Sequence, residues 1–115
     1  MTYIDGFLAP VHTDEAGYHA FAASMAPIFK EHGAIRVVEG WGDDVPRGQH
    51  TDFFRAVDAR EGETVVFSWI EWPDKATRDA GMARVMADPR MQPGGPMPFD
   101  GKRLIFGGFR AIVEL

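Results

Sequence analysis

The sequence predicts an α+β fold of the ferredoxin-like type, with a four-stranded antiparallel sheet and two helices on one of its faces. The main observation is the order of the predicted elements, which is strand, helix, strand, strand, helix, strand. Right-handed crossovers place both helices on the same side of such a sheet. The second observation is the length of 115 residues without a repeat or linker, which predicts one domain over residues 1–115.

The first half of the chain contains two predicted strands and one helix. Residues 3–11 are rich in apolar residues on both alternating faces and predict the first strand. Apolar residues then recur at three- and four-residue spacing after Thr13 or Asp14, either of which can cap an amphipathic helix. Pro27 predicts a kink or a break in this helix. Residues 34–41 follow as the second strand.

The second half contains the remaining strands and the second helix. Residues 51–57 fit a short edge strand, and residues 64–72, rich in β-branched and aromatic side chains, predict the strongest strand of the chain. A helix follows over residues 74–87, with a predicted inner face of Ala80, Met82, Ala83 and Met86. Residues 91–101 read as a loop packed back on the domain, and residues 103–113 as the last strand.

The strands carry apolar residues on both faces. The strand over residues 64–72 places Val65, Phe67 and Trp69 on one face, and Val66, Ile70 and Trp72 on the other. Two helices can cover only one face, and the uncovered one would exceed the few hundred Å² of apolar patch that monomers usually expose. We therefore expect a second copy of the chain to cover it, which makes a two-fold homodimer.

Composition excludes several classes of protein. The chain has no cysteine, which excludes disulfides, thiolate metal sites and cysteine nucleophiles. Its formal net charge is −5 without a basic block, so a nucleic-acid partner is not expected. No window approaches the roughly 18 apolar residues of a membrane span, and residues 1–5 lack the pattern of a signal peptide. We expect a soluble, cytoplasmic protein without membrane contacts.

Five segments resemble one family of proteins. They are Asp5-Gly6-Phe7, residues 42–46, 63–70, 85–90 and 97–103, and they are similar to the YbaA-like family of uncharacterised bacterial proteins over nearly the whole chain. The resemblance implies a dimeric α+β barrel and no particular activity. The wider superfamily includes cofactor-free monooxygenases, isomerases and haem-degrading enzymes, but fold-level analogy carries little functional weight. The second helix lacks the histidine that ligates haem in the haem-degrading relatives, and no cofactor is expected.

Four polar residues are candidates for catalysis. Asp5 and Glu39 each share a strand face with aromatic residues, where burial would suit a carboxylate to general acid or base chemistry. If both point to one side, they can form an acid–base pair, with Arg103 or Arg110 holding an anionic substrate. A structural ion pair or a cap is the alternative for each carboxylate. Ser68 is the small polar residue within an apolar strand, without a histidine placed to activate it.

Aromatic and methionine side chains are candidates for a ligand pocket. The candidates are Phe7, Trp41, Trp69, Met97 and Phe99, although core packing explains the rings equally well. No metal site is expected, because the histidines lack chelating spacing and the Asp43-Asp44 pair offers too few oxygens. The sequence thus predicts a homodimer that binds a small apolar or aromatic ligand between sheet and helices. A cofactor-independent monooxygenase or isomerase is the alternative.

Overall fold

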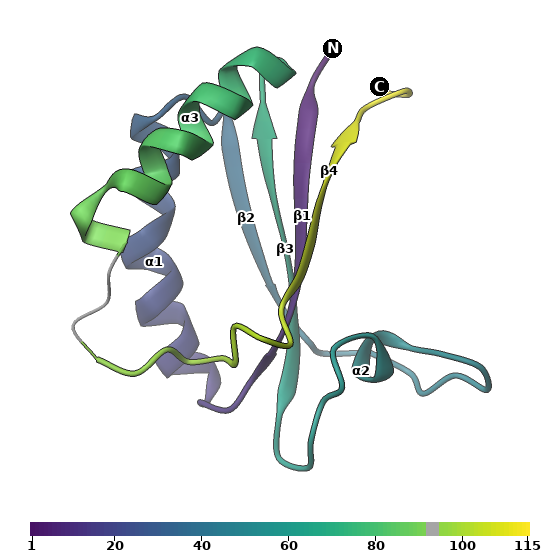
Figure 1. Cartoon of the computed structure of the whole chain (residues 1–115). Coiled ribbons are helices and arrows are strands. Elements are labelled where there is room, and N and C mark those ends of the chain that lie inside the picture. The colour runs from purple at the N-terminus through teal and green to yellow at the C-terminus, as the bar shows by residue number, and fades with distance from the viewer. Residues whose placement is uncertain (92–94) are drawn as a thin grey trace.

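The computed structural model describes residues 1–91 and 95–115, and it follows the predicted order of strands and helices (Figure 1). Its elements are β1 (Tyr3–Val11), α1 (Glu15–Glu31), β2 (Arg36–Trp41), α2 (Phe53–Ala56), β3 (Thr64–Trp72), α3 (Lys75–Ala87), the 3-10 helix η1 (Pro89–Met91) and β4 (Ile105–Arg110). The strands form one antiparallel sheet in the order β2-β3-β1-β4. Helices α1 and α3 cover one face of it, so the predicted ferredoxin-like α+β fold is confirmed.

Helix α1 begins at the predicted cap. The Asp14 carboxylate accepts a hydrogen bond of 2.8 Å from the backbone N–H of Gly17, which satisfies one of the free donors of the first turn. The helix continues through Pro27 to Glu31, so of the predicted kink or break the break does not occur. Proline removes one backbone hydrogen bond, whereas packing of the apolar face on the sheet holds the rest of the helix in place. Gly33, with a φ of +113°, turns the chain out of the helix.

The predicted edge strand over residues 51–57 is wrong, because part of it forms the short helix α2. Asp52 caps this helix by accepting hydrogen bonds from the backbone N–H groups of Arg55 at 2.8 Å and Gly48 at 3.1 Å. A side chain that satisfies nearby backbone donors favours a local turn over pairing with a strand. Helix α2 lies on the side of the sheet opposite α1 and α3 (Figure 1), where the Phe53 ring contacts Phe67 edge to face.

The predicted inner face of α3 is confirmed for Met82, which packs against the core, and wrong for Ala80, Ala83 and Met86, which are exposed. Gly81 and Val85 are the buried residues of this helix, whereas the Met86 side chain is 72% exposed. The cause is Trp72, a fully buried side chain whose ring packs directly on the helix backbone. A Cβ atom at Gly81 would come within 2.5 Å of this ring, so only glycine permits the approach. A pattern of apolar side chains cannot reveal that Gly81, which has no side chain, faces the core.

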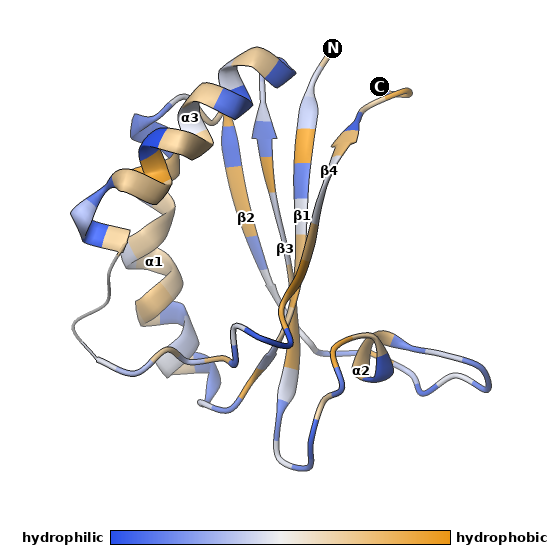
Figure 2. Cartoon of the chain, in the orientation of Figure 1, coloured by the Kyte–Doolittle hydropathy of each residue, from blue (hydrophilic) through white to orange (hydrophobic). Residues whose placement is uncertain are grey.

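The sheet has one covered face and one open face. Directly opposed residues of an antiparallel pair point to the same side, so the register places Phe7, Ser68 and Glu39 in one row facing the helices. The alternate positions form the outer face. It carries the apolar side chains of Ile4, Leu8, Phe67, Trp69, Ile105 and Phe109. Figure 2 shows that hydrophobic residues continue past the end of β4 toward the C-terminus.

The helices are too short or too polar to cross a membrane in the part of the chain that the structure describes.

Candidate functional site

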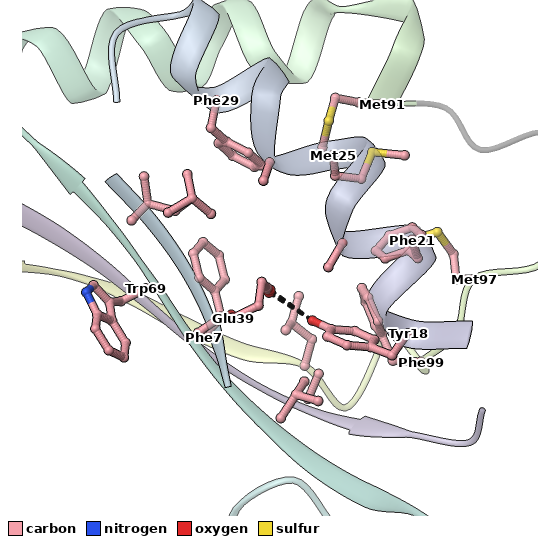
Figure 3. A pocket seen from close by; sticks show the side chains of 18 residues that line it. Phe7, Tyr18, Phe21, Met25, Phe29, Glu39, Trp69, Met91, Met97 and Phe99 are labelled. Atoms are coloured by element: carbon pink, nitrogen blue, oxygen red, sulfur yellow. Dashed lines mark hydrogen bonds between the residues drawn. The ribbon is translucent and has the colours of Figure 1, made fainter. Parts of the chain in front are cut away.

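An apolar cavity of about 180 Å³ lies between α1 and the covered face of the sheet (Figure 3). Helix α1 lines it with Phe21, Met25 and Phe29, because these residues recur at helical spacing on the face turned to the sheet. The chain after η1 lines it with Met97 and Phe99, whose ring meets Phe21 edge to face at 5.9 Å between centroids. The predicted packing of the 91–101 loop on the domain is therefore confirmed at Met97 and Phe99, while residues 92–94 of that loop lie outside the described residues.

The polar groups of the cavity are those of Tyr18, Glu39 and Ser68. The Tyr18 hydroxyl donates to the Glu39 carboxylate, at 2.9 Å from Oε1 and 3.0 Å from Oε2 (Figure 3). Ser68 faces the same carboxylate because it pairs directly with Glu39 across β2 and β3. The structure thus brings two of the four predicted catalytic candidates, Glu39 and Ser68, together in one site.

The surroundings of Glu39 change the acidity of both partners. Burial raises the pKa of the Glu39 carboxyl, and hydrogen bonding with the Tyr18 and Ser68 hydroxyls only partly offsets it. The pKa of Tyr18 is raised well above its usual 10, first by burial and then by the negative charge of Glu39. Tyr18 therefore keeps its proton at neutral pH and acts as a hydrogen-bond donor to the carboxylate.

Glu39 also reaches the surface, where the residue as a whole is exposed although its carboxylate faces the apolar cavity. Because β2 is an edge strand, its side chain borders a groove of about 290 Å³ between α1 and β2, lined further by Glu15, His19 and Trp41. Glu39 and Tyr18 line both the groove and the inner cavity. The two hollows also share Ala22, Ala26 and Val37, so they adjoin each other along α1 and β2 with the carboxylate at their common border.

Tyr18 is the functional residue that the sequence reasoning missed. It lies in the apolar stripe of α1, and its side chain is only 7% exposed. A tyrosine at a buried helix position carries a hydroxyl that needs a partner. The buried hydroxyl of Tyr18 could therefore have been recognised from the sequence. Its partner, Glu39, lies on another element and can be identified only from the folded structure.

Asp5 lies outside the cavity in a different cluster. Its side chain is 4% exposed and pairs with Arg78 of α3, whose Nη2 donates to Oδ1 at 2.8 Å and whose Nε lies 3.1 Å from both oxygens. The Trp72 Nε1 donates to Oδ2 at 2.9 Å. Asp5 pairs with Ile70, so it lies one inward-facing position along β1 from the row that contains Glu39. Across the sheet, β1 is two strands away from β2, which carries Glu39. The structure therefore does not join the two carboxylates in an acid–base pair.

Arg103 likewise lies outside the cavity. Its guanidinium donates to both carboxylate oxygens of Glu63, at 2.6 and 2.7 Å, and to Asp100 at 3.0 Å. A further bond of 2.9 Å goes to the backbone carbonyl of Asp58. The guanidinium thus joins the turn before β3 to the segment before β4. Arg110 lies on edge strand β4 opposite Tyr3.

Glu63 is expected to make stability depend on pH in the acid range. The hydrogen bonds from Arg103 lower the pKa of Glu63 from 4.5 to about 2 in the folded protein. The ionised carboxylate therefore stabilises the fold above pH 4.5, and this contribution is lost as the pH falls toward 2. In urea unfolding, Glu63→Gln should be less stable than wild type at neutral pH and equally stable near pH 2. Glu61→Gln, at an exposed site in the same turn, is the control, and a difference for Glu63→Gln that does not change with pH would contradict the expectation.

The predicted ligand-binding residues divide into three groups. Phe7, Met97 and Phe99 line the inner cavity. Trp41 lines the groove and packs against Tyr18, with 6.0 Å between ring centroids. Trp69 borders the cavity from β3, but its indole points to the outer face (Figure 3) and donates to Glu71 at 2.9 Å. Within residues 1–91 and 95–115, histidine and acidic side chains form no cluster of three that could hold a metal ion.

Comparisons with known proteins extend over almost the whole chain. The family DUF1428, described as a protein of unknown function, matches residues 2–101. The uncharacterized protein YbaA of Escherichia coli strain K12 and that of Shigella flexneri are each 54% identical over 116 residues, which is 99% of this chain and 99% of theirs. These matches confirm the resemblance that the sequence segments carry.

Two solved structures share the fold. A dimeric ferredoxin-like protein from an uncultured marine organism matches 99% of this chain and 98% of its own, with a TM-score of 0.61 and 11% identity. A mutant of SnoaB, a cofactor-independent oxygenase from Streptomyces nogalater, matches 99% and 96%, with a TM-score of 0.54 and 16% identity. At these identities the likeness extends to the fold alone.

Proposed function

The chain belongs to the DUF1428 family of proteins of unknown function, and from that premise we propose that it is a homodimer that binds a small apolar or aromatic molecule between α1 and the sheet. The observation that carries this proposal is the cavity, whose lining is almost wholly apolar apart from Glu39 and the hydroxyls of Tyr18 and Ser68. Ligand pockets typically combine an apolar lining with a few convergent polar groups that orient the ligand.

Ligand binding is expected to stabilise the protein against heat. At about ten times Kd, a ligand specific for the folded state adds about 1.4 kcal/mol, which raises the Tm by several degrees. We propose to screen single-ring and two-ring compounds by thermal shift against the wild type and two variants. Ala26→Phe projects a ring into the cavity from α1 and should abolish the response, whereas Ala83→Phe, at an exposed site on α3, should keep it.

Two results would contradict ligand binding in this cavity. One is a screen in which no compound shifts the Tm of the wild type. The other is a compound that stabilises Ala26→Phe as strongly as it stabilises the wild type and Ala83→Phe, because that compound would bind elsewhere.

The outer face of the sheet supports the homodimer. Phe67, Ile105 and Phe109 are 47%, 43% and 62% exposed on this face of one chain, although they are large apolar side chains. A second copy of the sheet packed face to face would remove them from water and complete an α+β barrel. The ferredoxin-like neighbour is described as dimeric, which supports a dimer here. We place this dimer in the cytoplasm, since the chain has no cysteine from which to form the disulfides common in small secreted domains.

A second candidate function is an enzyme of the cofactor-independent monooxygenase or isomerase type. The observation in its favour is Glu39, a carboxylate whose pKa is raised by burial and which borders an apolar cavity, as a general base requires. Compounds that shift the Tm would be incubated with protein in air, followed by oxygen uptake and NMR of the compound. Conversion that Glu39→Gln abolishes while binding persists supports an enzyme. Unchanged compounds support binding alone.

A further inference from the structure

The polar end of the cavity has a free acceptor. A carboxylate offers about four lone-pair positions. The Tyr18 hydroxyl supplies a single hydrogen, and its oxygen lies almost equally far from both Glu39 oxygens. Together with the Ser68 hydroxyl as a second donor, the described side chains of the cavity leave acceptor positions of the carboxylate to water or to a ligand. A ligand that carries an O–H or N–H group can bind there, whereas a ligand with acceptors only finds a negatively charged group.

The charge of the lining favours neutral ligands over charged ones. Among its described residues the cavity contains no lysine, arginine or histidine, and Glu39 is its charged residue. An anionic ligand would have to enter an apolar space next to a carboxylate, where both desolvation and repulsion oppose it. A cationic ligand would lose its hydration to a lining that offers a single counter-charge. A neutral ligand avoids both costs.

The size and lining of the cavity favour a ligand with a single aromatic ring. Its volume of about 180 Å³ is close to the roughly 150 Å³ of an apolar cavity that holds benzene. Phenylalanine rings line it on several sides, and the thioethers of Met25, Met91 and Met97 lie on the helix side (Figure 3). Aromatic rings and thioethers pack favourably against another aromatic ring.

We propose that the ligand is a neutral single-ring molecule with a hydrogen-bond donor on the ring, of the phenol type, and that this donor binds the Glu39 carboxylate. The proposal rests on the ligand-binding function above and specifies its chemical class. The ring lies among Phe7, Phe21 and the methionines, and its hydroxyl joins those of Tyr18 and Ser68 at the carboxylate.

The test is calorimetric titration of the full chain with four probes that share one ring: phenol, toluene, benzoate and benzylamine. Phenol should bind about tenfold or more tightly than toluene, because a hydrogen bond to a charged group contributes about 1.5–3 kcal/mol. Benzoate and the protonated benzylamine should bind more weakly than toluene. In Glu39→Gln, phenol should lose most of its advantage over toluene and benzoate should gain affinity. Glu15→Gln, which removes a carboxylate from the groove only, should keep the wild-type ranking.

The outcomes distinguish the ligand class from the site itself. If none of the probes binds, both the ligand class and the binding cavity are overturned. If toluene binds as tightly as phenol, or if benzoate or benzylamine binds more tightly than toluene, the cavity is still a binding site. The proposed class of neutral hydrogen-bond donors is then wrong. The wild-type ranking alone decides between these outcomes, so the test does not depend on how well Glu39→Gln folds.

Discussion

Replacing Asp5 with alanine is expected to lower the free energy of unfolding by about 3–5 kcal/mol. The substitution leaves the Arg78 guanidinium, which is 23% exposed, without its buried counter-charge, and it leaves the Trp72 Nε1–H without an acceptor. Both losses fall on groups that water reaches poorly, which is why the penalty exceeds that of a surface ion pair. Urea unfolding at one fixed protein concentration measures it.

Asp79→Ala is the matched control for Asp5→Ala. Asp79 also contacts Arg78, at 3.0 Å, but its side chain is 48% exposed, so its removal should cost less than about 1 kcal/mol. Equal losses in the two variants would show that burial does not set the strength of the Asp5 pair. An Asp5→Ala protein as stable as wild type that fails to bind ligand would instead assign Asp5 to the functional site.

Phe109→Asp is expected to convert a dimer into a monomer. The Phe109 ring packs over Gly6 and Gly107 on the outer face, at the edge of a hollow that β1, β3 and β4 line. A ring at such a place is a typical anchor of an interface, and a carboxylate there would be buried without a partner. Light scattering after gel filtration should give about twice the chain mass of 12.8 kDa for wild type and a single chain mass for the variant.

The control for the assembly experiment is Met86→Asp. Met86 is 72% exposed on α3, on the other side of the sheet, so the same change of chemistry should leave the dimer intact. A monomeric wild type at micromolar concentration would contradict the homodimer. A Phe109→Asp protein that remains dimeric would place the interface on another surface.

Periodicity predicted the parts of the fold that bury side chains in a regular pattern. The first strand and the strand over residues 64–72 have the predicted bounds, because their apolar runs end at turn residues. Helix α2 escaped prediction because the hydrogen bonds of Asp52, rather than hydrophobicity, decide its local structure. The inner face of α3 escaped it because Gly81 is buried against Trp72 without contributing a side chain.

Those site residues could be predicted whose position depends only on the face of the strand that carries them. Phe7 and Glu39 lie on the predicted faces of their strands, and pairing across β3 brings them together with Ser68. The surroundings of Asp5 and Arg103 depend on partners 73 and 40 residues away, Arg78 and Glu63. No local pattern specifies contacts of that kind. They follow from strand register and helix placement, which a sequence determines only through the whole fold.

A crystal structure of the protein soaked with phenol tests the binding site most directly. We expect the ring between α1 and the sheet, among Phe7, Phe21 and Met25, with its oxygen at hydrogen-bond distance from the Glu39 carboxylate. A ring bound in the outer-face hollow beside Gly107, or an empty cavity at a phenol concentration that raises the Tm, would contradict the proposed site.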